Sequence, residues 1–181
     1  MTEPEPERPE QVIRIVLDAS AIGEYGRGAH VGEVIAHLGT ELALYLDASE
    51  DDLLGVPAFG VPVLALSTAW QRADGKQAQD LILSMLGHPW CIVLPVSREQ
   101  VRRPGDLGWE HPLPEWTAEL GAQEAAHTLV CAIDHRCQVL TKAPEDYVLD
   151  GNILDALLVR IPRDGDGWPD LRQYWPADPT G

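Results

Sequence analysis

Asp18 is the residue of this chain that is best placed to carry chemistry. It directly follows residues 12–17, a short apolar run that reads VIRIVL. A buried strand that delivers a carboxylate at its carboxyl end commonly places a metal ligand or a catalytic acid in an α/β protein. The position also suits a structural role, because an aspartate there can cap the following helix by accepting backbone N–H groups. The sequence leaves both roles open.

Further candidate ligands lie within residues 118–134, which are predicted to form a helix. Glu124, His127 and Cys131 stand at i, i+3 and i+7, so they share one helix face and are of the types that bind zinc. Only neighbouring pairs on one helix can chelate the same ion, and a buried Cys among Ala and Leu is common in a core. We therefore favour packing over zinc binding. Glu124 has a further structural interpretation, since its charge suits the positive end of the helix dipole.

The chain alternates predicted strands with predicted helices, judged by the spacing of apolar residues. The strands are residues 13–17, 91–96, 138–140 and 157–161, and helices begin at residue 19 and span 31–42, 78–86 and 118–134. The apolar run 63–66 is interpreted either as a strand or as the start of a helix that reaches Trp70. This alternation predicts a single three-layer α/β domain, in which a central, mostly parallel sheet is flanked by helices.

The folded domain is predicted to span residues 12–162. Residues 1–11 are rich in Pro and Glu, which is typical of a disordered acidic tail, and residues 163–181 are punctuated by Gly and Pro, which predicts an irregular C-terminal tail. No apolar run has transmembrane length, and no signal segment is recognised. Three cysteines without a CxxC pair suit a reducing compartment. We therefore expect a soluble cytoplasmic protein with no membrane partner.

The net charge of -16 argues against nucleic acid as the main partner. Residues 12–162 alone carry -11, and such a surface repels phosphate backbones. The one dense basic patch is Arg98, Arg102 and Arg103, which we interpret as a solvated loop or helix face. RNA binding is therefore disfavoured, and a protein partner or a second copy of the chain is expected instead.

Three segments together resemble the PIN domain, a compact Mg²⁺- or Mn²⁺-dependent nuclease fold. IVLDAS at residues 15–20 resembles that family's opening strand and first acidic residue, and GVPVLALSTAW at 60–70 is similar to the segment that carries the second acid. EAAHTLVCAIDHRCQVLTKAPEDY at 124–147 resembles the helix, strand and turn that supply the third and fourth acids. The resemblance spans residues 12–162.

The acids that this resemblance implies are only partly present. Asp18 matches the first, and Glu124 stands at the third, where Asp is usual. Thr68 replaces the second acid and Ala143 the fourth, with Glu145 and Asp146 following soon after. The resemblance thus implies Asp18 and Glu124 as catalytic residues, and Asp18, Glu124 and Asp146 as metal ligands. Because hard cations need several oxygen ligands, we expect either no metal or weakly bound Mg²⁺ or Mn²⁺.

The expected function follows from this incomplete acidic cluster. We expect a PIN-like protein that is catalytically weak or inactive and acts as a binding or regulatory module, through homodimerisation or a protein partner. An alternative is a toxin-like endoribonuclease that uses Mg²⁺ or Mn²⁺ and is paired with an antitoxin. A third alternative is a structural or interaction protein that shares only the α/β topology, because fold does not fix function.

Overall fold

The computed structural model describes residues 11–28, 32, 56–88, 90–97, 121–142, 144–147 and 158–162. Several predicted features lie outside these residues: the tails at 1–10 and 163–181, most of the helix at 31–42, and the basic patch Arg98, Arg102 and Arg103. Among the residues that are described, no helix has both the length and the apolarity needed to cross a membrane.

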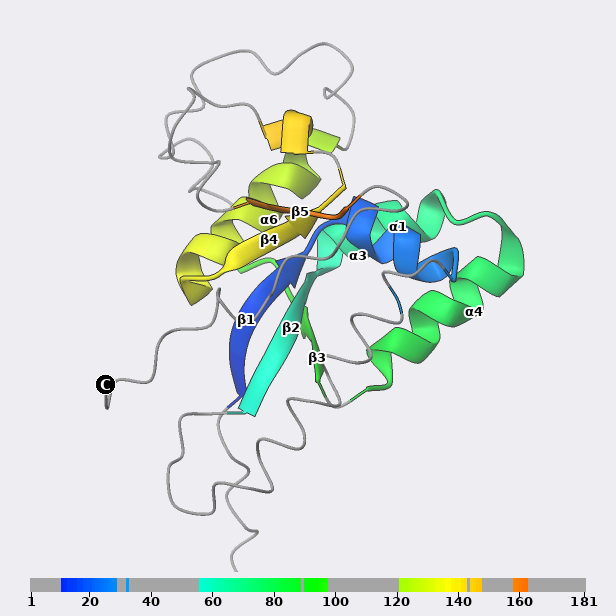
Figure 1. Cartoon of the computed structure of the whole chain (residues 1–181), viewed down its shortest axis with the longest axis horizontal. Coiled ribbons are helices and arrows are strands. Elements are labelled where there is room, and N and C mark those ends of the chain that lie inside the picture. Colours follow the sequence, from blue (N-terminus) through cyan, green and yellow to red (C-terminus); the bar gives the residue numbers. More distant parts are fainter. Residues whose placement is uncertain are drawn as a thin grey trace, which may run out of the picture.

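Parallel strands form the centre of the structure. In chain order the elements are β1 (Gln11–Leu17), α1 (Ala19–Gly26), β2 (Val56–Pro62), α3 (Val63–Gln71), α4 (Gly75–Leu86), β3 (Cys91–Leu94), α6 (Gly121–His135), β4 (Gln138–Thr141), the 3-10 helix η2 (Pro144–Tyr147) and β5 (Leu158–Arg160). The strands form one five-stranded sheet in the order β3-β2-β1-β4-β5, and every neighbouring pair is parallel. This arrangement confirms the predicted α/β class (Figure 1).

β1 is the central strand, and its composition explains why. A parallel strand with helices on both faces is buried on both sides, so it is apolar without strict alternation. Ile15, Val16 and Leu17 are all fully buried. The register of β1 against β2 shifts between Ile13 and Ile15, so Arg14 is the extra residue of a bulge. The bulge lets Ile13 and Val16 join the same apolar cluster although they are three residues apart.

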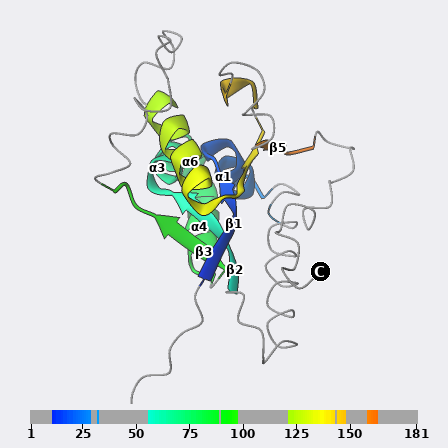
Figure 2. The ribbon, with the colours of Figure 1, turned by 90° about the vertical axis from the view of Figure 1, so that its left-hand side faces the viewer.

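Two apolar clusters cover the two faces of the sheet. The first joins Ile15, Leu17, Phe59 and Val61 to buried residues of α1, α3 and α4. The second joins Ile13, Val16, Ala58 and Val139 to buried residues of α6. Figure 1 shows α1, α3 and α4 to the right of the strands, and the turned view in Figure 2 brings α6 to the front. Helices therefore pack on both faces, as a three-layer arrangement requires.

Gly60 in β2 leaves the space that the second cluster fills. A Cβ atom at this position would lie 2.7 Å from Leu94 Cδ1 and 2.9 Å from Ile13 Cγ2. We expect Gly60→Ala to lower the free energy of unfolding by about 2 kcal/mol, because an added methyl group overpacks the contact between neighbouring strands. Urea denaturation measures this change. Gly23→Ala in α1 is the control for a methyl group added without a clash, since a Cβ there meets nothing within 4 Å, and it should not lower the free energy of unfolding.

α6 ends in a left-handed turn at Arg136. The Cys137 N–H donates to the carbonyl of Ala132 at 3.0 Å, the Arg136 N–H donates to that of Ile133 at 3.1 Å, and Arg136 has φ 52°. This is a Schellman motif, whose left-handed position favours glycine. We expect Arg136→Gly to raise the free energy of unfolding by about 1 kcal/mol in urea denaturation. Arg136→Ala, which keeps the Cβ, should bring no such gain.

The structure differs from the sequence prediction around β2 and β3. The pattern does not predict β2, because Pro57 and Pro62 indicate turns; in the structure they are the second and the last residues of the strand. The run 63–66 opens α3, which confirms the second of its two predicted alternatives, a helix that reaches Trp70. β3 ends at Leu94, before the predicted end at residue 96, because Pro95 has no N–H to continue the ladder.

Candidate functional site

The candidate site lies where the order of the strands reverses. β1 pairs with β2 on one side and with β4 on the other. The sheet grows from β1 through β2 to β3 in one direction and through β4 to β5 in the other. Leu17 pairs with Leu140, which brings the carboxyl ends of the two strands together. The Asp18 N–H donates to the carbonyl of Leu140 at 3.3 Å. Open α/β sheets bind their ligands at such a switch point.

Asp18 is the N-cap of α1 and is almost completely buried. Its Oδ1 accepts hydrogen bonds from the Ala21 N–H at 2.8 Å and from the Ser20 hydroxyl at 2.7 Å. Its Oδ2 accepts one from the Tyr147 hydroxyl at 3.1 Å. Burial raises the pKa of Asp18, and its hydrogen bonds, including one with Thr141, offset only part of that effect. The capping role considered from the sequence is therefore present.

Glu124 faces the same first turn of α1 from α6. Its Oε1 accepts hydrogen bonds from the Ala19 N–H at 3.3 Å and from the Thr128 hydroxyl at 3.4 Å. Burial raises the pKa of Glu124 to about 7, with a further contribution from the negative charge of Asp18. The structure thus brings together the two predicted acids, which lie 106 positions apart in the sequence. The negative charge of Asp18 therefore disfavours the ionisation of Glu124.

Ser20 links α1 to the end of β4. Its hydroxyl oxygen accepts a hydrogen bond from the Lys142 N–H at 2.8 Å and lies 3.5 Å from the Thr141 hydroxyl. Because Ser20 also donates to Asp18, it connects the carboxylate to the residues at the end of β4. Sequence reasoning did not assign a role to Ser20 or to Tyr147. The Asp-Ala-Ser pattern at the helix start is a signal that could have identified Ser20.

At the remaining predicted positions, the structure describes no further acidic side chain beside Asp18 and Glu124. Thr68 is buried on α3, and one turn later the charge of Arg72 partly offsets the raised pKa of Glu124. Ala143 lies outside the described residues. Asp146 belongs to η2, but its side chain, like that of Glu145, lies outside what the structure describes. The predicted role of Asp146 as a ligand therefore stays a prediction.

A divalent cation fits the described residues poorly. Three of the four carboxylate oxygens of Asp18 and Glu124 already accept hydrogen bonds from protein donors. Mg²⁺ and Mn²⁺ prefer a larger set of oxygen ligands in near-octahedral geometry. Within the described part of the chain, no group of three or more His, Cys, Asp or Glu side chains could hold a metal ion.

The zinc alternative on α6 fares no better. His127 and Cys131 are buried, and Cys131 belongs to the second apolar cluster, between the sheet and α6. Burial lowers the pKa of His127, an effect that the Pro95 backbone partly offsets. Neither ring nitrogen of His127 makes a hydrogen bond of ordinary geometry in the described structure. Packing is thus the role that the surroundings of these two residues support.

Exposed cations flank this acidic site. Glu24 on α1 accepts a hydrogen bond from Lys142 Nζ at 2.7 Å and also pairs with Arg27. Burial raises the pKa of Glu24, but the two cations more than offset this, so it lies below its ordinary value. The described residues hold seven Lys or Arg and eight Asp or Glu residues, a difference of one negative charge. The acidity that the sequence assigned to the folded part therefore lies mostly in the segments outside them.

Comparison of the chain with protein-family models, curated proteins and solved structures found no match. The resemblance to PIN domains therefore remains a prediction from the sequence segments. The fold class that it implies agrees with the parallel sheet and its flanking helices.

Proposed function

We propose that this protein is a PIN-like domain with an incomplete acidic metal site and that it serves as a non-catalytic binding or regulatory module. The placement of Asp18 and Glu124 at the switch point supports descent from an acidic, ligand-binding site. Thr68 and Ala143, at positions where the resemblance calls for acids, support the loss of that site's charge density. Water activation by a metal ion needs this charge density.

The observation that carries the proposal is the internal hydrogen bonding of the two carboxylates. Asp18 uses both of its oxygens to hold α1 and η2, and Glu124 holds the first N–H of α1. Carboxylates that are committed to protein donors contribute to stability and specificity of the fold. A cation must displace these donors to bind, so its affinity should be low.

The module is proposed to act through a second copy or a protein partner. β3 is an edge strand of the described sheet, and its Val93 is 42% exposed. Val96, just beyond the same strand, is 39% exposed. An apolar edge strand is a ready template for association with another chain. Light scattering at tens of micromolar protein tests whether the chain forms a homodimer. A monodisperse monomer would exclude the homodimer and leave a different protein as the partner.

The nuclease question is settled by two measurements on the whole chain. Isothermal titration calorimetry with Mg²⁺ and with Mn²⁺ should give no heat or only weak, millimolar binding. Incubation with a labelled RNA and Mn²⁺ should give no cleavage above that of Asp18→Asn. Asp80→Asn serves as the control for both assays, because it removes an exposed acid on α4.

The alternative is a Mg²⁺- or Mn²⁺-dependent endoribonuclease of the toxin type. The convergence of Asp18 and Glu124 favours it, as does the position of Asp146 next to Tyr147, which contacts Asp18. Micromolar cation binding together with RNA cleavage that disappears in Asp18→Asn would establish this alternative and overturn the inactive module. Cleavage that persists in Asp18→Asn would point to a contaminating nuclease and leave the proposal in place.

A further inference from the structure

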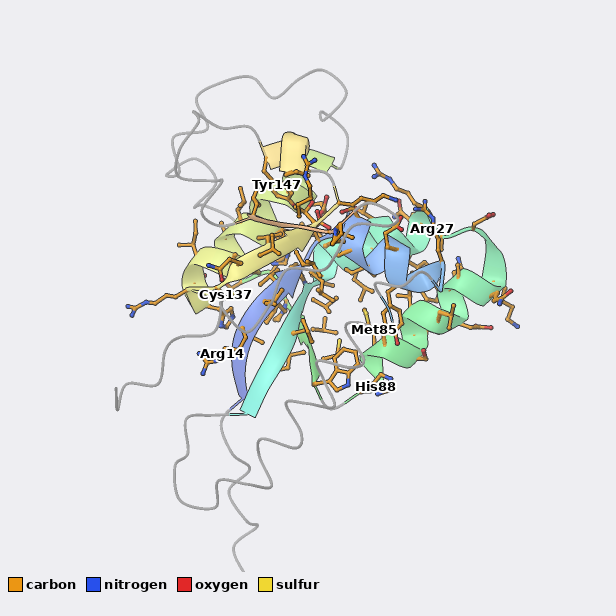
Figure 3. The ribbon with its side chains drawn as sticks, viewed as in Figure 1. Arg14, Arg27, Met85, His88, Cys137 and Tyr147 are labelled. Atoms are coloured by element: carbon orange, nitrogen blue, oxygen red, sulfur yellow. The ribbon has the colours of Figure 1, made fainter. Side chains whose placement is uncertain are left out.

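Tyr147 makes a buried contact with Asp18 that neither the capping of α1 nor the packing of the core requires. The tyrosine is the last residue of η2, is 4% exposed and belongs to the second apolar cluster. Its hydroxyl donates to Asp18 Oδ2 at 3.1 Å, across 129 positions in the sequence. Figure 3 shows Tyr147 on the η2 side of the molecule, near the carboxyl ends of the strands.

The two carboxylate oxygens of Asp18 accept hydrogen bonds from different elements. Oδ1 receives the Ser20 hydroxyl and the Ala21 N–H, and both donors belong to the start of α1. The bond from the Ala21 N–H caps the helix. Oδ2 points to η2 and receives the Tyr147 hydroxyl. Asp18 also makes a hydrogen bond with the Thr141 side chain at the end of β4. Without the Tyr147 hydroxyl, Oδ2 would lose this neutral donor and become more accessible to a cation.

We propose that the Tyr147 hydroxyl is a built-in competitor that occupies the cation-facing oxygen of Asp18 and keeps divalent cations out of the site. A phenol hydroxyl is a neutral donor, so it satisfies a buried carboxylate oxygen without bringing a compensating charge. This inference rests on the proposal that Asp18 belongs to a degenerate cation site, and it names the residue that closes that site.

Removal of the hydroxyl should open Asp18 to cations. We expect Tyr147→Phe to bind Mn²⁺ about fivefold to tenfold more tightly than the wild type, the size expected from freeing one hydrogen-bonded carboxylate oxygen. Titration calorimetry at pH 8 measures the change. Tyr25→Phe is the matched control, since Tyr25 lies about two turns further along α1 and is partly buried. The gain should disappear in the double variant Tyr147→Phe, Asp18→Asn.

Tyr147→Met provides a second route if Tyr147→Phe melts below the assay temperature, because it also keeps an apolar side chain in the cluster without a hydroxyl. Equal or weaker Mn²⁺ binding by the folded variants would overturn the competitor role and assign Tyr147 to the orientation of Asp18. That outcome leaves the inactive module standing. RNA cleavage by the wild type, in contrast, overturns the proposed function whatever the variants bind.

Discussion

Asp18→Ala should lower the free energy of unfolding by about 3 kcal/mol, while Asp18→Asn should leave it close to the wild-type value. The alanine removes the acceptor of the Ser20 hydroxyl, the Ala21 N–H and the Tyr147 hydroxyl, and it also removes the hydrogen bond with Thr141. Loss of an N-cap costs about 1 kcal/mol. Each buried donor that is left without an acceptor adds about 1–3 kcal/mol. Urea denaturation at pH 8 measures both variants.

The asparagine separates the hydrogen bonds of Asp18 from its charge. Its side-chain oxygen can still accept from Ser20 and Ala21, and the Tyr147 hydroxyl can turn to accept from the amide group. Burial raises the pKa of Asp18, so the surroundings of this side chain disfavour its charged form. A neutral side chain of the same shape removes that penalty. Strong destabilisation by Asp18→Asn would instead show that the negative charge itself is needed, as a cation site requires.

The central strands β1 and β4 could be predicted from the sequence because parallel strands with helices on both faces are mostly apolar. Ile15, Val16 and Leu17 of β1 are fully buried, as are Val139 and Leu140 of β4. β2 could not be predicted, because prolines at its second and last positions resemble turn signals. Its central Gly60 adds to this difficulty, since its small size is explained only by the side chains of Leu94 and Ile13 on neighbouring strands.

The candidate site was predictable only as far as local patterns extend. Asp18 is identified by its place at the end of an apolar strand, and Glu124 by its place at the start of a helix. Tyr147 gives no such signal, because its role depends on a contact across 129 positions. The raised pKa of Glu124 also depends on packing, since it results from burial and from the charge of Asp18. The role of Tyr147 and the raised pKa of Glu124 therefore depend on contacts between distant segments, which local patterns do not reveal.

Glu124→Gln should raise the free energy of unfolding at pH 8 by about 3 kcal/mol and should flatten its pH dependence. The pKa of Glu124 rises from an ordinary 4.5 to about 7 in the folded protein. At about 1.36 kcal/mol per pH unit, this difference amounts to about 3 kcal/mol against the charged form. Glutamine keeps an oxygen that can accept from Ala19 and Thr128.

The sign of the pH dependence follows from which state holds the proton. Below pH 4.5 the folded and unfolded chains both keep the Glu124 proton, so the group does not affect stability. Between pH 4.5 and about 7 the unfolded chain loses the proton while the folded chain keeps it. The wild type should therefore lose stability as the pH rises through this window, and the loss should stay constant above it. Glu124→Gln should lack this contribution, whereas Asp80→Asn should retain it.

The same experiment in the presence of a cation distinguishes a structural acidic pair from a metal site. A ligand that binds only the folded state raises its stability according to its concentration and affinity. If Asp18 and Glu124 serve mainly to hold α1, then 5 mM Mg²⁺ should change the unfolding of the wild type at pH 8 only slightly. If Mg²⁺ restores as much stability as Glu124→Gln does, the pair is a working cation site, because the ion then supplies the charge compensation that the protein donors do not.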